Sequence, residues 1–372
     1  MNFEFSDEQK FIQNQAREFL QKECTPEQVR LVLDSDEPYH RDLWKSIVEL
    51  GWTATTIPEE YGGLGLGYLE LCVIAEELGR SLAPVPFSSS VYLATEAILL
   101  AGSDSQKEKY LPQLACGELM GTAALVEKNG SCTASNMQCR FDGSSITGSK
   151  TAVPDATVAS LAVVACREEG LEGFSLFLVD LRDENVSSDT LESMDGSRPV
   201  GNLKFWEVAT ERLGQPGEGQ FLVEQLFDRV AVLLAFEQIG GAQAAIEMAC
   251  EYTKARYAFG RQVASFQAIK HKLANMFVDN ELAKANAYYG AWALSTAAPE
   301  LPLAAATARV SAIDAYFHCT KENIQAHGGM GFTWEFNCHL YYRRAQSLAL
   351  LLGGQRIWKN LLVDRLQQQT AA

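Results

Sequence analysis

The spacing of hydrophobic residues along the chain changes twice and so divides it into three stretches. Up to residue 118, apolar residues recur three or four positions apart, as they do along one face of a helix. From residue 119 to 219, short β-prone runs alternate with turn residues. From residue 220 to 372, helical spacing returns. The pattern predicts an α+β fold with an N-terminal α-helical domain, a middle antiparallel β domain and a C-terminal four-helix bundle.

Individual elements can be placed within each stretch. Ser6, followed three positions later by Gln9, forms the pattern of a capping box and predicts the start of the first helix. A glycine-rich break at Tyr61–Gly67 precedes another expected helix at Leu69–Leu82. The expected strands are Ala123–Val126, Ser145–Thr147, Ser160–Ala165 and Ser175–Val179. After a turn at Gln215–Gly219, the expected long helices are Phe221–Thr253, Phe266–Leu294, Pro302–Ile324 and a final one around Ile357–Leu366.

Composition and charge exclude several classes of protein. With 372 residues, of which 47% are hydrophobic and 21% charged, the chain is long and apolar enough for a large core. Its formal net charge of -16 argues against nucleic acid or an anionic membrane as the main partner, because both require basic surface. An anionic ligand would therefore have to be held by local cationic sites.

Cysteine and histidine usage gives no sign of a disulfide framework or a metal site. The nine cysteines include no C-x-x-C pair, and the five histidines are isolated, so we expect reduced thiols and no metal. His327 is expected to be structural. The N-terminus is acidic without an apolar run, and the longest apolar stretches fall short of a membrane span. We therefore expect a cytoplasmic, bacterial-type protein.

One segment, Arg256 to Met276, combines a helical pattern with a cationic loop. Its apolar residues recur at helical spacing from Phe266 onward, and the loop ahead of them carries Arg256, Gly260 and Arg261. Two cations beside a glycine suit an anion that approaches the backbone closely. Taken alone, this pattern is a weak signal, because arginines that flank a helix usually belong to a solvated face.

Three motifs in this chain resemble those of the acyl-CoA dehydrogenase family. RYAFGRQVASFQAIKHKLANM resembles the family's Arg-x-x-Phe-Gly…Phe-Gln segment, and QAHGGMGF at Gln325–Phe332 resembles its Gln-x-x-Gly-Gly-x-Gly stretch. IPEEYGGLG at Ile57–Gly65 resembles its N-terminal signature. The motifs follow the family order and cover nearly the whole chain. The resemblance implies the helical, β, helical architecture already expected, with domains at 1–118, 119–219 and 220–372.

The resemblance also implies a reaction, a cofactor and partners. Family members are FAD-dependent oxidoreductases that desaturate acyl-CoA thioesters between the α and β carbons. A carboxylate removes the α-proton while a hydride leaves to the flavin. Electrons then usually pass to an electron-transfer flavoprotein. The family also implies an oligomer, commonly a dimer of dimers, with each flavin shared across a subunit interface.

Residues that match the part of this site supplied by the neighbouring subunit are well kept. By the resemblance, Arg256 corresponds to the pyrophosphate-binding arginine, with Phe259 beside it and Gln267 eleven residues after the arginine. Ala258 departs from relatives that carry a hydroxyl there. A second FAD clamp, in which glycines allow backbone N–H groups to approach phosphate, is implied at Gln325, Gly328 and Gly329.

Residues that match the chain's own flavin contacts are poorly kept. In the segment Gly148–Pro154, Ala152 replaces the family's aromatic residue and Pro154 replaces a hydroxyl that would bond the flavin. Proline also lacks a backbone N–H. The preceding segment still resembles a flavin-binding strand and offers Val126 and Ser131 as cofactor-binding residues.

Both positions at which relatives carry the catalytic base are apolar here. Counting from the family motifs gives Leu352 and Val230, and neither can accept a proton. Asp228 is the nearest carboxylate, but two residues along a helix is about 200° of rotation. The alternative interpretation of Asp228 is as half of a charged pair with Arg229 that opens the helix. Glu237 is expected to be solvated or at an interface, so no catalytic residue is assigned.

Three hypotheses about function remain open. The leading one is a subunit of a heteromeric acyl-CoA dehydrogenase, resembling the subunit that lacks the base and supplying FAD contacts to a homologous catalytic partner. Two-gene dehydrogenases of this type act on bulky thioesters such as steroid side chains. The first alternative is a self-sufficient homo-oligomeric dehydrogenase with an atypically placed base, for which Asp228 is the candidate. The second is a non-enzymatic assembly subunit.

Overall fold

The computed structural model describes residues 5–128, 130 and 132–371, and the chain forms two compact units. The first, called here the helical unit, comprises residues 1–30, 68–83 and 231–372. The second, called the mixed unit, comprises residues 31–67 and 84–230. Each unit is therefore assembled from segments that are distant in the sequence.

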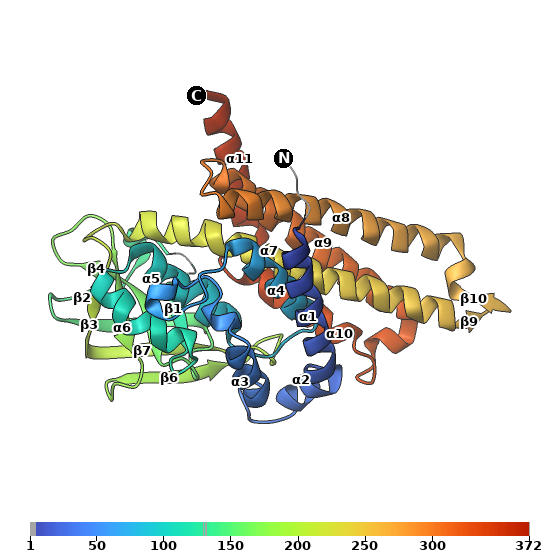
Figure 1. Ribbon diagram of the computed structural model, residues 1–372, viewed down its shortest axis with the longest axis horizontal. Coiled ribbons are helices and arrows are strands. Elements are labelled where there is room, and N and C mark those ends of the chain that lie inside the picture. The colour runs from blue at the N-terminus through green and yellow to red at the C-terminus, as the bar shows by residue number, and fades with distance from the viewer. Residues whose placement is uncertain (1–4, 129, 131, 372) are drawn as a thin grey trace. The chain divides into compact units, whose positions relative to one another are not determined.

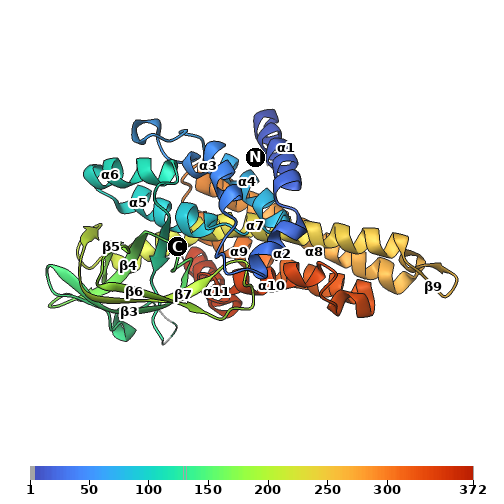
Figure 2. The same ribbon diagram turned by 90° about the horizontal axis from the view of Figure 1, so that it is seen from below.

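The helical unit is built around long helices. Figure 1 shows α7 (Gly219–Ala255), which enters this unit at residue 231, running beside α8 (Gln267–Ser295). A hairpin of β9 (Tyr257–Ala258) and β10 (Arg261–Gln262) lies at their tip. The other helices of the unit are α1 (Asp7–Glu23), α4 (Tyr68–Arg80), α9 (Leu301–His327), α10 (Cys338–Leu350) and α11 (Gln355–Ala371), with α2 (Pro26–Leu33) beginning in it. Figure 2 shows α10 along the same helix pair from a second direction.

Sequence patterns located these helices well, with one omission. The capping box at the start of α1 is confirmed, because the Gln9 amide donates to the Ser6 hydroxyl and the Ser6 amide donates to the Gln9 side chain. All four long helices predicted after residue 220 are present. Helix α10 was missed. Arg344, only 1% exposed, lies on its buried face and interrupts the apolar stripe that the prediction depended on.

The mixed unit contains one large sheet flanked by short helices. Its strand order is β6-β7-β3-β2-β4-β5-β8, and β1 pairs separately with β4. The strands are β1 (Gly121–Ala124), β2 (Arg140–Phe141), β3 (Ser145–Pro154), β4 (Leu161–Glu168), β5 (Ser175–Asp180), β6 (Val186–Leu191), β7 (Val200–Ala209) and β8 (Glu211–Leu213). The short helices are α3 (Arg41–Glu49), the π-helical segment η3 (Ser88–Thr95), α5 (Glu96–Ala101) and α6 (Asp104–Ala115).

The sheet is mostly antiparallel, as predicted, and departs from that pattern along one edge of β4. One edge of β4 pairs in parallel first with β1 and then with β2, while its other edge pairs antiparallel with β5. Because both edges of β4 are covered and its residues are almost all buried, its sequence is nearly continuously apolar. Such a run gives no indication of strand direction.

Helix α7 is long and apolar enough to cross a membrane by length and composition alone. The expectation that no apolar stretch reaches that length is therefore wrong for this helix. However, 89% of its most apolar window is buried inside the protein. The apolar character of α7 is accounted for by the protein core.

Glycines allow α4 and α7 to pack backbone against backbone within the helical unit. A Cβ atom at Gly240 would overlap the carbonyl of Glu76, and one at Gly79 would overlap the carbonyl of Glu237. The reciprocal positions show that the two helices run antiparallel at this crossing. No rotamer change could relieve the overlap, because both obstacles are backbone atoms.

We therefore expect Gly240→Ala to lower the free energy of unfolding by about 3 kcal/mol, since overpacking outweighs the gain of about 1 kcal/mol from alanine's helix propensity. Denaturant titration followed by circular dichroism would measure the change. Gly329→Ala is the matched control, because a Cβ there would meet nothing within 4 Å. Equal stability of the two variants would contradict the close packing.

A partly buried polar seam joins α1 to α4. Side chains one turn apart on α1 contact acidic residues of α4 in three pairs: Gln9 with Glu70 (2.9 Å), Gln13 with Glu76 (3.1 Å) and Arg17 with Glu77 (2.6 Å). Burial, with repulsion from Glu77 as a second cause, raises the pKa of Glu76 to about 7. Glu76 is thus a carboxyl group that the folded state prefers to keep protonated.

A raised carboxyl pKa means that the folded state binds the proton more tightly than the unfolded state. The contribution of Glu76 to stability is therefore fully present below pH 4.5 and is lost as the pH rises to about 7. We expect Glu76→Gln to be more stable than the wild type at pH 8 and to show a smaller decline in stability between pH 5 and 8. Parallel unfolding titrations would measure the difference, and identical pH slopes would show that Glu76 is not buried in protonated form.

Candidate functional site

The cationic loop predicted from the sequence forms a tight hairpin at the tip of the helical unit. Helix α7 ends at Ala255, strands β9 (Tyr257–Ala258) and β10 (Arg261–Gln262) pair antiparallel, and α8 begins at Gln267. The two loop residues, Phe259 and Gly260, both have positive φ, at 52° and 79°. This is the arrangement of a type I′ hairpin turn.

Phe259 is an unusual residue for that turn. A bulky side chain with positive φ is uncommon, and its ring is 95% exposed. The ring makes an edge contact with Phe266 at a centroid separation of 6.2 Å, while the Arg261 guanidinium lies 4.0 Å from the other ring's centroid. The hairpin is thus held against the start of α8, and it presents an aromatic side chain outward.

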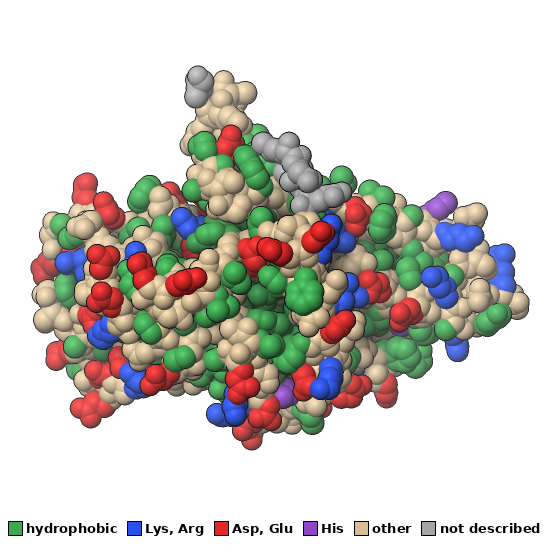
Figure 3. All heavy atoms as spheres, in the orientation of Figure 1, with side chains coloured by type: hydrophobic (Ala, Val, Ile, Leu, Met, Phe, Trp, Pro, Cys, Tyr) green, Lys and Arg blue, Asp and Glu red, His purple; other side chains and the backbone are tan. Residues whose placement is uncertain are grey.

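Charge is concentrated around this hairpin. Residues 252–278 contain five basic residues and no acidic ones, in a chain whose net charge is -16. Figure 3 shows Lys and Arg side chains gathered where Figure 1 places β9 and β10. Arg256 is exposed, and among the described residues its guanidinium has no carboxylate partner. The tip is therefore a local cationic surface suited to an anionic ligand.

The glycine-rich stretch lies at the C-terminal end of α9 and in the 3-10 turn η6 (Gly328–Phe332). Gly328 has φ 62° and ψ -139°, a conformation that essentially requires glycine. Gly329 has no such requirement, and a Cβ at either position would meet nothing within 4 Å. Glycine at 329 is therefore not explained by packing within the chain, and its backbone is open to close approach from outside.

His327 supports this stretch from beneath. Its ring is 4% exposed, stacks on Tyr252 at 4.0 Å, and has Nδ1 2.9 Å from the carbonyl oxygen of Asn323. Burial lowers the pKa of His327, so the neutral ring is favoured. These contacts give His327 the structural role expected for it and join the end of α9 to the end of α7.

The structure brings the two predicted clamps together. Helices α8 and α9 run antiparallel, with Lys272 paired to Glu322 and Asp279 to His318 (2.7 Å). Extending that register places Gln267 level with the glycine-rich turn. The six residues predicted in the helical unit therefore gather at one end of it. All six are exposed: Arg256, Phe259, Gln267, Gln325, Gly328 and Gly329. An exposed arginine beside open backbone glycines fits a pyrophosphate group.

The other two predicted cofactor-binding residues belong to the mixed unit. Val126 is half-buried, and its carbonyl accepts a hydrogen bond from the amide of Thr151 at 2.9 Å. This bond joins the segment around Val126 to Gly148–Pro154, the two segments that correspond to flavin-binding strands in the family resemblance. Ser131 lies outside the described residues.

The segment Gly148–Pro154 does not present flavin-binding groups. The register of β3 against β7 shifts between Lys150 and Val153, and Ala152 within this bulge is exposed with a φ of 52°. The Pro154 carbonyl accepts a hydrogen bond from the Thr122 hydroxyl at 2.6 Å. Ala152 thus offers only a methyl group, and the Pro154 carbonyl is already bonded to Thr122. Neither residue supplies an aromatic face or a hydrogen-bond donor for a flavin ring.

Neither of the two positions at which relatives carry a base holds a carboxylate. Val230 is fully buried in α7. Leu352 lies between α10 and α11 with a φ of 65°, and its carbonyl accepts a hydrogen bond from the Trp358 indole at 3.2 Å. The loop is also held from below by Arg309, which donates to the Leu351 carbonyl at 2.7 Å and to the Leu348 carbonyl.

The two carboxylates considered as substitutes lie in other surroundings than expected. Asp228 does not open a helix, because α7 begins nine residues earlier at Gly219, and it is 5% exposed. Its neighbour Arg229 pairs with Glu96 at 2.7 Å. Glu237 is fully buried rather than solvated or at an interface, with the Arg344 guanidinium 3.8 Å away.

Arg309, Glu237 and Arg344 form a buried charge network that sequence reasoning missed. Arg309 is completely buried and also donates to the Gln238 side chain at 2.7 Å, and burial lowers its pKa to about 9. The sequence feature that could have indicated this network is the presence of charged residues within otherwise apolar stretches of α7, α9 and α10. In the described residues no group of three potential metal ligands is found.

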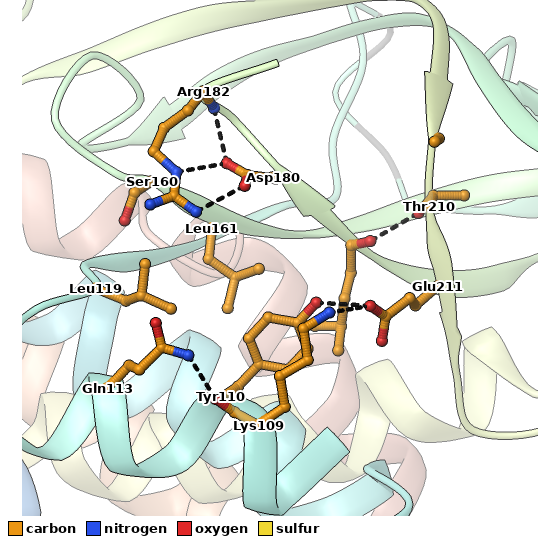
Figure 4. Close-up of a pocket in the computed structure, with 12 residues that line it drawn as sticks. Lys109, Tyr110, Gln113, Leu119, Ser160, Leu161, Asp180, Arg182, Thr210 and Glu211 are labelled. Atoms are coloured by element: carbon orange, nitrogen blue, oxygen red, sulfur yellow. Dashed lines mark hydrogen bonds and ion pairs between the residues drawn. The ribbon is translucent and has the colours of Figure 1, made fainter. Parts of the chain in front are cut away.

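A separate cavity of about 380 Å³ lies in the mixed unit, between α6 and the sheet. Figure 4 shows that its charged side chains are turned toward one another, with Glu211 bonded to Lys109 and Tyr110, and Arg182 to Asp180. None of the predicted site residues lines it. Its charges are already matched, so the cavity is not the predicted cofactor site.

Comparison with known proteins identifies the same family from both ends of the chain. Residues 6–118 match the acyl-CoA dehydrogenase N-terminal domain, and residues 217–367 match the acyl-CoA dehydrogenase C-terminal domain. An acyl-CoA dehydrogenase of Mycobacterium tuberculosis, IpdE2, is 31% identical over 352 residues, which is 94% of each chain.

Two solved structures resemble this one over essentially their whole length. Butyryl-CoA dehydrogenase from Megasphaera elsdenii has a TM-score of 0.90 and 25% identity, covering 99% of this chain and 100% of that one. A chain of the ChsE4–ChsE5 complex from Mycobacterium tuberculosis has a TM-score of 0.88 and 25% identity, covering 100% and 99%. The order of a helical N-terminal part, a middle sheet and a helical C-terminal part is that of these proteins.

We expect Arg309→Met to lower the free energy of unfolding by about 3 kcal/mol, because it leaves two helix-end carbonyls and the Gln238 side chain without their buried donor. Thermal and denaturant unfolding would measure the loss. The matched control is Arg356→Met, which removes an exposed arginine from α11. If Arg309→Met were as stable as that control, the network would not be holding the loop.

Proposed function

This chain belongs to the acyl-CoA dehydrogenase family, and on that premise we propose that it is one subunit of a heteromeric acyl-CoA dehydrogenase. It would supply FAD contacts to a homologous partner subunit that carries the catalytic base and the flavin-ring contacts. The family consists of flavin-dependent oxidoreductases that act on CH–CH bonds, and bound FAD supplies the hydride acceptor for that chemistry. The complex would desaturate acyl-CoA thioesters between the α and β carbons.

The observation that carries the proposal is an asymmetry between the two halves of the cofactor site. The residues that match contacts to a neighbour's FAD are exposed and gathered at one tip of the helical unit. The positions that match the chain's own ring contacts and base are Ala152, Pro154, Leu352 and Val230, none of which offers a side-chain donor or a carboxylate. Random substitution in a chain without a function would be expected to change the clamp residues as much as the positions of the ring contacts and the base.

The clamp has the chemistry that a pyrophosphate needs. Arg256 can donate to two phosphate oxygens, and nearby basic residues raise the local positive potential. The N–H of Gly328 donates to the Gln325 carbonyl, but the absence of side chains at 328 and 329 leaves the backbone of this turn open to close approach by an anion. Phe259, exposed at the hairpin turn, would cover an apolar or aromatic face of the cofactor.

Substrate, acceptor and location follow from family likeness. A chain of a two-component complex is among the similar structures, which supports a homologous partner. We extend the proposal to bulky acyl-CoA thioesters such as steroid side chains, to an electron-transfer flavoprotein as the acceptor, and to a cytoplasmic enzyme assembled as a dimer of dimers.

One observation favours a second candidate, a self-sufficient dehydrogenase. Asp228 is a buried carboxylate in α7, within two residues of a family base position. Burial of a carboxylate is a common means of preparing a general base. In that case, the chain alone would reduce an artificial electron acceptor with an acyl-CoA, and Asp228→Asn would abolish the activity.

We expect the chain purified alone to show no flavin absorbance, and the complex purified after coexpression with its homologous partner to be yellow. Arg256→Ala in this chain should weaken FAD binding by the complex about tenfold to a hundredfold, the usual cost of losing a charged hydrogen bond. FAD titration of the deflavinated complex, followed by flavin fluorescence, would measure it.

The matched control is Lys270→Ala, which removes the same charge from the exposed start of α8 at a position outside the family clamp. Its FAD affinity should change much less. Full flavin occupancy of the chain alone, bleached by an acyl-CoA, would contradict the subunit hypothesis and favour Asp228 as the base. Unchanged FAD binding by the Arg256→Ala complex would instead support a purely structural subunit.

A further inference from the structure

Two buried thiols meet inside the sheet of the mixed unit. The Sγ atoms of Cys139 and Cys166 lie 3.2 Å apart, and neither residue is exposed. Among the cysteines of the described residues, these two are the pair whose sulfur atoms are in mutual contact. The contact joins residues 27 positions apart in the sequence, so no spacing motif indicates it.

The strand register places the two cysteines on facing positions of neighbouring strands, at a spacing that a disulfide can bridge. Arg140 and Phe141 of β2 pair in parallel with Arg167 and Glu168 of β4, so Cys139 and Cys166 are the next facing pair. The Arg167 amide donates to the Cys139 carbonyl at 2.9 Å, which extends the pairing to that position. Neighbouring strands lie about 4.8 Å apart, within the Cα separation of about 4.4 to 6.8 Å found across disulfides.

The remaining surroundings of Cys139 hold it in place. A Cβ at Gly148 would lie 2.9 Å from the Cys139 sulfur and 2.6 Å from its Cα, so glycine leaves the room that this cysteine occupies. The Cys139 amide donates to the Glu127 carboxylate at 3.0 Å, and the same oxygen accepts from Lys150 at 2.8 Å. The thiol is therefore fixed between β3 and β4 and beside a buried cation.

The two thiols differ in their tendency to ionise. The hydrogen bond with Cys166 is the main cause that lowers the pKa of Cys139, and the charge of Lys150 acts in the same direction. Burial raises the pKa of Cys166. Cys139 is thus the sulfur better able to attack an oxidant, and Cys166 is placed to attack Cys139 in turn.

Cys139 is fully buried, so an oxidant could reach it only through a local opening of the short strand next to it. The strand β2 has only two residues, and the side chains on either side of Cys139, Gln138 and Arg140, are exposed. Few backbone hydrogen bonds must break to open so short a strand, and local openings of this kind are frequent in native proteins.

We propose that Cys139 and Cys166 form a reversible dithiol–disulfide pair that a hydroperoxide oxidises. The Cys139 thiolate attacks the terminal oxygen of the hydroperoxide, the O–O bond breaks, and a sulfenic acid forms on Cys139. The other oxygen leaves as hydroxide or alkoxide and takes up the proton that the Cys139 thiol gave up, which yields water from hydrogen peroxide and an alcohol from an organic hydroperoxide. The Cys166 sulfur then attacks that sulfur, the S–O bond breaks, and water carries away the Cys166 proton. Both sulfurs are oxidised and the peroxide is reduced by two electrons in total, while a dithiol reductant reverses the change.

Formation of the bond shortens the sulfur separation from 3.2 Å to about 2.05 Å and ties β2 to β4. The Cys139 amide donates to the carboxylate of Glu127, the residue after Val126, and Lys150 donates to the same carboxylate oxygen. A movement of Cys139 on disulfide formation would therefore be passed to Glu127 and Lys150. The redox state of this pair would thereby alter the rigidity of the segment that precedes β2. This inference does not depend on the proposed partner subunit.

The test uses the intact wild-type protein, treated with hydrogen peroxide and then unfolded, alkylated and mapped by mass spectrometry. We expect a crosslinked Cys139–Cys166 peptide whose mass is lower by two hydrogens, which dithiothreitol converts back to two alkylated thiols. Hydrogen exchange across residues 138–141 should slow in the oxidised protein. Exposed Cys116 reports whether the peroxide dose was sufficient.

Cys139→Ala should lose the crosslinked peptide, while the matched variant Cys319→Ala, which removes an equally buried thiol from α9, should keep it. Circular dichroism would establish that both variants are folded. The proposal is overturned if Cys116 is oxidised while Cys139 and Cys166 remain alkylatable in the wild type, or if Cys139 is carried on to the sulfinic acid without a crosslink.

Discussion

Burial of charge at the centre of the helical unit constrains much of its structure. Arg309 has no contact with water, and its two terminal nitrogens donate to helix-end carbonyls and to the Gln238 side chain, while its buried Nε has no hydrogen-bond partner among the described residues. Glu237 and Arg344 bring opposite charges into the same interior. A buried ion without its partners costs several kcal/mol, so helices α7, α9 and α10 can pack in few other arrangements. The same requirement fixes the loop around Leu352, where relatives place a base, and makes it a structural support here.

The tip of the helical unit is exposed, in contrast to its buried charge network, and it carries features that packing within the chain does not explain. Phe259 exposes a large apolar ring while its backbone adopts a disfavoured conformation, and both cost free energy in an isolated chain. Gly329 adds conformational freedom to the unfolded chain without filling a space that only glycine could fill. Costs of this kind persist when contacts outside the chain compensate them. A clamp for a cofactor held by another subunit would provide such contacts.

Sequence patterns predicted those parts of the fold that depend on local periodicity. The long amphipathic helices, the capping box at Ser6 and the existence of a central sheet were all recoverable, because each is encoded within a few turns or strands. The parallel pairing of β4 was not, since a strand covered on both edges is apolar throughout and carries no mark of direction. Helix α10 was missed for a related reason, because Arg344 occupies an interior position that patterning assigns to an apolar residue. For the candidate site, family motifs located the clamp residues, but their exposure and mutual proximity came only from the structure.

Strand β3 keeps its structural contacts within the sheet, although two of its residues lack the groups that the family resemblance implies for flavin binding. Pro154 and Ala152 cannot make the contacts that relatives direct at a flavin ring, yet both lie in a strand that is otherwise well ordered through the Glu127–Lys150 pair. A buried ion pair must be well bonded to be tolerated, and the Glu127 carboxylate also accepts hydrogen bonds from the amides of Gln138 and Cys139. The Glu127–Lys150 pair thus ties β3 to the segment that precedes β2, while Ala152 and Pro154 on the same strand present no group that would bond a flavin ring.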